Sequence, residues 1–274
     1  MQASILVESK ERGGEYLFSK LSVFLRQSRQ WLHREKNKCL FYFGSKRHVP
    51  VYAVLGCHSS GSSALMGVLW HLGVYLGEEL VGIYGVPPYY GGEERRLAEF
   101  LTRDILYPTG LSHRLPLEER RRELREIVHS LCTTVAGDSQ PVAIKFPTLA
   151  PHGFELKRLL GKRLRVILCQ RPIEESIRSF CRRFPDDHPE AVAQHQRWLT
   201  ESAQKLVATL PAKDVLTVDY SQLLNETEKV VNDLKEFLKV TPSPDQIQAA
   251  IHSIRPDLRH FGVESRDGLS SREP

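Results

Sequence analysis

The stretch VYAVLGCHSSGSSALMGVLWHLG, residues 51–73, carries the pattern that decides the fold. It opens with a short apolar run at 51–55, which is typical of a buried central strand. After a loop bounded by Gly56 and Gly61, apolar residues recur at helical spacing and stop near Gly73, where a helix can end. The sequence therefore predicts a strand, a glycine-bounded loop and a helix, in that order.

The loop after the strand has the features of an anion-binding turn. Its glycines allow the backbone to curl tightly, and the following helix presents free N–H groups and its positive dipole end to the loop. The candidate ligands for a phosphate or sulfate group are Ser59, Ser60, Gly61, Ser62 and Ser63. The alternative interpretation is a tight strand–helix turn with incidental serines.

This loop differs from the phosphate loop of the nucleotide triphosphatases. The spacing of Gly56 and Gly61 fits their motif, GxxxxGK followed by Ser or Thr, but Ser62 stands where that motif has its lysine. That lysine reaches the β- and γ-phosphates, and the hydroxyl after it holds magnesium. ATP hydrolysis is therefore poorly supported, and a ligand with a 5′-phosphate but no triphosphate to cleave fits better.

Three more short apolar runs repeat the strand pattern further along the chain. They lie at 142–144, 165–169 and 215–218, and a helix-like stretch follows each of them. This alternation predicts a three-layer α/β fold of phosphate-loop architecture, with a central parallel sheet and helices on both faces. The helices expected after the runs are 154–160, 172–184 and 226–238, with additional cover from 117–131 and 189–210.

The 274-residue chain is expected to form one α/β domain at 49–262 with an extension at each end. Residues 1–48 contain a basic amphipathic helix at about 15–33, which can pack on its own domain, on a partner subunit or peripherally on a membrane. Residues 263–274 are polar and are expected to form a mobile tail.

Composition restricts the classes of function. The formal net charge of +5 is compatible with an anionic ligand but too small to indicate nucleic acid, so no nucleic-acid partner is expected. Five cysteines without a CxxC pair indicate neither a disulfide framework nor a zinc site, and no HExxH motif points to a metal. The sequence has no signal-peptide pattern and no apolar run of the ~20 residues that a membrane span needs, so the cytoplasm is the expected location.

A second motif, RVILCQRPIEESIRSF at 165–180, supplies another candidate phosphate contact. Its strand delivers Arg171, and a helix beginning at Pro172 carries Ser179 eight residues after the arginine. Proline suits the first turn of a helix, and a guanidinium group forms bidentate hydrogen bonds with phosphate oxygens. Taken alone, an arginine in this position is also typical of a solvated or ion-paired strand end.

Together the two motifs resemble the sulfotransferases that use 3′-phosphoadenosine 5′-phosphosulfate (PAPS). The segment SSGSSAL at 59–65 is similar to the 5′-phosphosulfate loop of that family, which commonly reads SGTT or SGTS. In the family, an arginine after such a strand and a serine eight positions later hold the 3′-phosphate. The resemblance therefore implies that Arg171 and Ser179 contact this phosphate of the nucleotide.

The resemblance also implies the chemistry. A sulfuryl group would pass by in-line displacement from PAPS to a hydroxyl or amine of a small-molecule or glycan acceptor, leaving 3′-phosphoadenosine 5′-phosphate (PAP), with no metal required. The family often has Lys or Arg before the SG pair, and Ser59 occupies that position. His58 and Lys145 are the candidates for the missing positive charge, since Lys145 ends a predicted strand, where parallel α/β sheets form their sites. Otherwise Lys145 is an ordinary strand-end lysine with its ammonium in water.

The general base has four candidates, two glutamates and two histidines. In some family branches a glutamate after the loop removes the proton of the acceptor, and PPYYGGEERRLAEF at 87–100 resembles that region. Glu93 is the first candidate and its neighbour Glu94 the second, although two glutamates at a helix start are also favoured by the helix dipole alone. Branches that use histidine point instead to His58 or His152.

Two other functions remain open. A divergent nucleotide kinase or triphosphatase would bind ATP or GTP with magnesium, but the absence of the loop lysine argues against this function. A non-catalytic nucleotide-binding protein would show affinity without turnover, and the departure at Ser59 is consistent with it.

Overall fold

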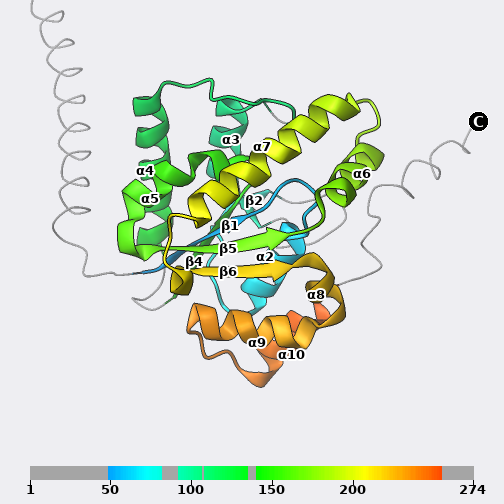
Figure 1. Ribbon diagram of the computed structural model, residues 1–274. Coiled ribbons are helices and arrows are strands. Elements are labelled where there is room, and N and C mark those ends of the chain that lie inside the picture. The colour runs from blue at the N-terminus through cyan, green and yellow to red at the C-terminus, as the bar shows by residue number, and fades with distance from the viewer. Residues whose placement is uncertain (1–48, 82–91, 107, 135–139, 255–274) are drawn as a thin grey trace, which may run out of the picture. The chain divides into compact units, whose positions relative to one another are not determined.

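The computed structural model describes residues 49–81, 92–106, 108–134 and 140–254, all of which fall in one compact unit (Figure 1). The amphipathic helix predicted within 1–48 and the tail predicted at 263–274 lie outside these residues.

Four parallel strands form the central sheet. β1 (Val51–Leu55) pairs with β4 (Val142–Lys145) on one side and with β5 (Leu164–Gln170) on the other, and β5 pairs with β6 (Val215–Asp219). The strand order is therefore β4-β1-β5-β6, and all four strands match the apolar runs of the sequence. Every residue of β1 is buried, because this strand has a neighbour on each side and helices over both faces.

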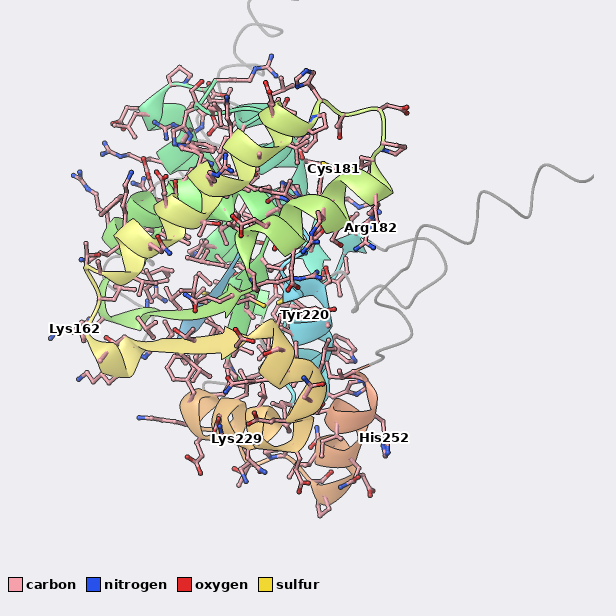
Figure 2. All side chains as sticks on the ribbon, turned by 45° about the vertical axis from the view of Figure 1, so that its right-hand side comes forward. Lys162, Cys181, Arg182, Tyr220, Lys229 and His252 are labelled. Atoms are coloured by element: carbon pink, nitrogen blue, oxygen red, sulfur yellow. The ribbon has the colours of Figure 1, made fainter. Side chains whose placement is uncertain are left out.

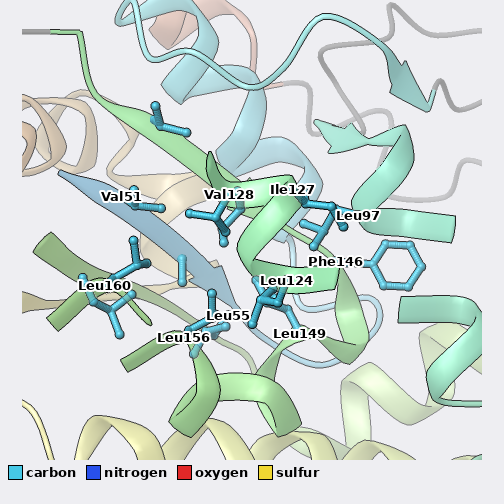
Figure 3. Close-up of a cluster of buried hydrophobic side chains, with 14 of the residues drawn as sticks. Val51, Leu55, Leu97, Leu124, Ile127, Val128, Phe146, Leu149, Leu156 and Leu160 are labelled. Carbon is cyan, nitrogen blue, oxygen red and sulfur yellow. The ribbon is translucent and has the colours of Figure 1, made fainter. Parts of the chain in front are cut away.

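Helices cover the two faces of the sheet as separate layers (Figure 1). Along β1, Val51, Ala53 and Leu55 point into one core cluster, whereas Tyr52 and Val54 point into the other. Figure 3 shows the first cluster, in which side chains of β1 pack against those of the covering helices. That layer contains α3 (Arg95–Asp104), α4 (Leu117–Thr134), α5 (Gly153–Leu160) and α7 (Pro189–Val207), and the opposite layer contains α2 (Ser62–His71), α9 (Thr227–Leu238) and α10 (Pro244–His252).

The three-layer α/β fold predicted from the sequence is thus confirmed, and the structure adds several short elements. β2 (Leu80–Val81) and β3 (Glu93–Glu94) form a small antiparallel pair outside the main sheet. Neither that pair nor the capping box that starts α10 belongs to the predicted elements. The remaining elements are α6 (Ile173–Arg183), α8 (Tyr220–Asn225), and the short helices η2 (Pro147–His152), η3 (Gly161–Arg163) and η4 (Ala212–Asp214). None of the helices in the described part of the chain is long and apolar enough to span a membrane.

Candidate active site

The carboxyl ends of the four parallel strands lie along one edge of the sheet, which is where open α/β folds place their ligands. β1 leads there into the glycine-bounded loop, residues 56–61, referred to below as the phosphate loop. β4 delivers Lys145, β5 is followed by Arg171, and β6 is followed by Tyr220, which is labelled in Figure 2. Residues distant in the sequence therefore meet at this edge.

The phosphate loop is tightly wound. The N–H of Ser60 donates to the carbonyl of Cys57 (3.3 Å), and both Ser59 (φ 60°) and Gly61 (φ 92°) have left-handed backbone conformations. A Cβ atom at Gly61 would collide with the ring of Tyr220, so glycine is required there for close approach as well as for its backbone. The loop ends directly at Ser62, the first residue of α2, whose first N–H groups have no partner within the helix.

The five predicted loop ligands differ in their burial. Ser59, Gly61 and Ser63 are half-buried, whereas Ser60 and Ser62 are buried. The hydroxyl of Ser60 lies over the backbone of the loop and has no hydrogen-bond partner among the described residues. The half-buried members are therefore the more accessible to a ligand.

Lys145 connects two of the other predicted site residues. Its side chain is only 3% exposed, and its Nζ donates to Ser63 Oγ (3.1 Å) and pairs with Glu93 Oε1 (2.5 Å). A positive charge delivered from β4 thus lies against the phosphate loop, although the loop itself has no lysine.

The two adjacent glutamates have different surroundings. Glu93 directs its carboxylate to Lys145, whereas Glu94 caps α3 by accepting the N–H of Leu97 (2.7 Å). Neighbouring residues of an extended segment point in opposite directions, which explains the separation. Of the two, only Glu93 contacts another predicted site residue.

Arg171 ties the turn after β5 to the phosphate loop. Its Nη1 donates to the carbonyl of Ser59 (3.0 Å), its Nε pairs with Glu175 (3.2 Å), and its Cζ lies 4.7 Å from the centre of the Tyr220 ring. Ser179 lies on α6 and is half-buried, and its hydroxyl makes no hydrogen bond among the described residues. The structure therefore places Arg171 at the loop and leaves Ser179 without a contact to it.

His58 is packed into the protein interior. Its ring lies 5.2 Å from that of Phe180 and 5.4 Å from that of His195, and its backbone exchanges two hydrogen bonds with the side-chain amide of Gln196 (2.9 and 3.2 Å). Burial lowers its pKa well below the usual value, and the charges of His195, Lys145 and Arg183 lower it further. A lowered pKa favours the neutral imidazole, so Lys145 remains the stronger of the two candidates for the positive charge.

His152, the remaining candidate base, is fully buried beside Asp104 and His113 and belongs to a separate cluster. Two residues that hold the loop were not identified from the sequence. Gln196 gives no sequence signal, because a glutamine on an amphipathic helix is ordinary. Tyr220 directly follows a strand, as Arg171 does, so the strand-end position was the available signal.

The sequence matches no protein-family model and no curated protein. Solved structures do share its fold. The sulfotransferase domain of the olefin synthase from Synechococcus PCC 7002 superposes with a TM-score of 0.50 at 20% identity, over 81% of this chain and 83% of that one. The sulfotransferase STF9 from Mycobacterium avium superposes with a TM-score of 0.54 at 9% identity, over 79% of this chain and 70% of that one. The chain therefore has the fold of these bacterial sulfotransferases.

Proposed function

We propose that this protein is a sulfotransferase that moves a sulfuryl group from PAPS to a hydroxyl or amine of a small-molecule or glycan acceptor. The observation that carries the proposal is the position of Lys145, whose ammonium contacts both Ser63 beside the phosphate loop and Glu93. One residue thereby joins the proposed donor site to the proposed base. The shared fold supports the same conclusion.

In this proposal the donor binds along the carboxyl edge of the sheet. The N-terminus of α2 and the hydroxyls of Ser59 and Ser63 hold the 5′-phosphosulfate, because both provide hydrogen-bond donors to an anion. Arg171 binds the 3′-phosphate, with its guanidinium already oriented by the Ser59 carbonyl and by Glu175. Ser179, eight residues after Arg171 on α6, is the second residue proposed to bind this phosphate.

Lys145 and Glu93 divide the work of the transfer. The acceptor oxygen or nitrogen forms a bond to sulfur, the bond between sulfur and the 5′-phosphate oxygen breaks, and the PAP that leaves gains negative charge. Lys145 stabilises that charge, and Glu93 takes the proton of the acceptor. An anionic donor gives the ammonium of Lys145 a second partner beside Glu93.

Thermal shift measurements with PAP and with ATP plus magnesium test the proposal. Stabilisation by PAP alone is expected, because a ligand that binds the folded state raises the melting temperature by mass action. The PAP shift is also measured for Lys145→Met. Lys162→Met is the matched control, since Lys162 precedes β5 at the opposite edge of the sheet (Figure 2). Stabilisation by ATP plus magnesium alone would favour the kinase or triphosphatase, and PAP binding without PAP release from PAPS across an acceptor panel would favour a non-catalytic protein.

A further inference from the structure

Three polar residues that the proposed reaction does not use meet in the layer of α3 and α7. Asp104 ends α3, His113 lies in the connection to α4, and His152 ends η2. One oxygen of Asp104 and one nitrogen of each histidine all lie within 4.8 Å of one another. Asp104 and His152 are fully buried, while the side chain of His113 is 25% exposed.

Hydrogen bonding within the cluster is incomplete. His113 Nδ1 lies 2.6 Å from Asp104 Oδ2 in a hydrogen bond. His152 Nε2 lies 3.2 Å from the same oxygen but does not point along the line that a hydrogen bond requires, and neither of its ring nitrogens has a hydrogen bond among the described residues. A buried polar atom without a partner lowers the stability of the folded protein. The ring nitrogens of His152 are therefore available to bind a ligand such as a metal ion.

The position of the His152 ring is fixed by its surroundings. It packs against Phe100 (5.3 Å between ring centres) and against His113 (4.7 Å), both at steep angles. The carboxylate of Asp104 is fixed as well, because its Oδ1 accepts the N–H groups of Leu115 (2.7 Å) and Arg114 (3.1 Å). Oδ2 is therefore held facing the two imidazoles, in the way that outer hydrogen bonds orient the ligands of a metal.

We propose that Asp104, His113 and His152 bind a divalent transition-metal ion, with Zn²⁺ as the expected occupant. Two imidazole nitrogens and one carboxylate oxygen form a donor set suited to such ions. In tetrahedral zinc sites with bonds of about 2.0–2.1 Å, ligand atoms lie about 3.3 Å apart. The 3.2 Å between Asp104 and His152 fits this spacing, and the 2.6 Å between Asp104 and His113 would lengthen by about 0.7 Å.

The ion would act as a structural clip, independently of the proposed transfer reaction. It joins the end of α3, the chain before α4 and the end of η2. The first two segments are already linked by hydrogen bonds from the backbone of Arg114 and Leu115 to Asp104. The connection before α4 also reaches the phosphate loop, because the carbonyl of Gly110 contacts His195 (2.5 Å), whose ring lies against His58. Metal binding therefore stabilises the connection before α4, which contacts the phosphate loop indirectly through His195.

Metal binding to the purified full chain tests this site. The protein is treated with EDTA, dialysed against Zn²⁺ or Co²⁺, and analysed for bound metal and for the visible absorption of tetrahedral Co²⁺. Binding of about one equivalent per chain is expected, together with a melting temperature raised by Zn²⁺. His113→Asn is the informative variant, because this partly exposed residue is the least needed for folding. It should weaken metal affinity by more than about 10-fold.

His252→Asn is the matched control, because His252 is exposed on α10 in the opposite layer (Figure 2). It should bind metal as the wild type does. Equal binding by wild type and His113→Asn, or Co²⁺ with only the spectrum of the hydrated ion, would overturn the proposal and leave a hydrogen-bonded cluster. No nucleotide or acceptor enters this experiment, so its outcome is separate from that of the proposed sulfotransferase activity.

Discussion

Helix α3 has a buried polar cluster at each end, and the two clusters are built differently. Before its first residue, Glu93 pairs with Lys145, whose ammonium also contacts Ser63. At its last residue, Asp104 accepts two backbone N–H groups and lies against two histidines. The first cluster consists of contacts between side chains, which can change partners when an anion binds. In the second, backbone N–H groups hold the carboxylate of Asp104, and these groups are fixed by the fold. The first arrangement suits a site that changes at every turnover, and the second suits a fixed anchor.

The largest expected effect is on catalysis at the first cluster. Lys145→Met should lower kcat by about 10²–10³-fold, because a preorganised positive charge beside the leaving group is lost. PAP release from PAPS with an acceptor that the wild type uses provides the measurement. Lys162→Met, at the other edge of the sheet, should retain the wild-type rate. The same kcat in both variants would remove Lys145 from the reaction.

A substitution in the second cluster should lower the free energy of unfolding. Asp104→Ala leaves the N–H of Leu115 without its acceptor, at a cost of about 1–3 kcal/mol, whereas the N–H of Arg114 keeps its hydrogen bond to the backbone carbonyl of residue 104. The free energy of unfolding in urea should fall by about 2 kcal/mol. Asp186→Ala, at an exposed position, is the control and should have little effect. A loss of less than about 1 kcal/mol in Asp104→Ala would show that the carboxylate is no anchor.

Arg171→Ala separates phosphate recognition from support of the loop. PAP should bind about 30-fold more weakly, which corresponds to about 2 kcal/mol for a lost charge-assisted hydrogen bond. Adenosine 5′-phosphosulfate, which lacks the 3′-phosphate, should lose much less affinity, and calorimetry with both ligands measures the difference. Equal losses would mean that Arg171 acts only by holding the Ser59 carbonyl.

The smallest effect concerns the neighbouring glutamates. Glu94→Ala removes the cap of α3 and should lower the free energy of unfolding by about 1 kcal/mol, while kcat stays close to that of the wild type. Glu93→Gln should show the reverse pattern, with a reduced kcat and an almost unchanged stability. The two variants are compared by urea unfolding and by PAP release. Loss of activity in Glu94→Ala alone would reassign the base.

Most of the sheet could be predicted because each strand is a run of apolar residues with both faces covered, a pattern that few other structures produce. The small pair of β2 and β3 could not, because two residues are too few to show a period. Lys145 and Arg171 could be placed at the site since they sit at strand ends. The burial of His58 could not be predicted, because it depends on Phe180 and His195 from other helices.

The cluster of Asp104, His113 and His152 shows a different limit. Asp104 and His113 are nine residues apart, His152 lies much further along the chain, and the three have no helical or motif spacing, so no metal was expected from the pattern. They come together because α3, the chain before α4 and η2 pack in one layer. Contacts between separate elements of this kind depend on the tertiary structure, and no local sequence pattern predicts them.

The close approach of Gly61 to Tyr220, and of Tyr220 to Arg171, has a consequence for ligand selectivity. With the hydrogen bond from Arg171 to Ser59, it joins the turns after β1, β5 and β6 into one stiff frame. If PAPS binds as proposed, this frame favours molecules whose two anionic ends have the matching separation over shorter or longer ones. Inhibitors for this proposed site are therefore best designed around the distance between two charges, before any attention is given to the sugar that connects them.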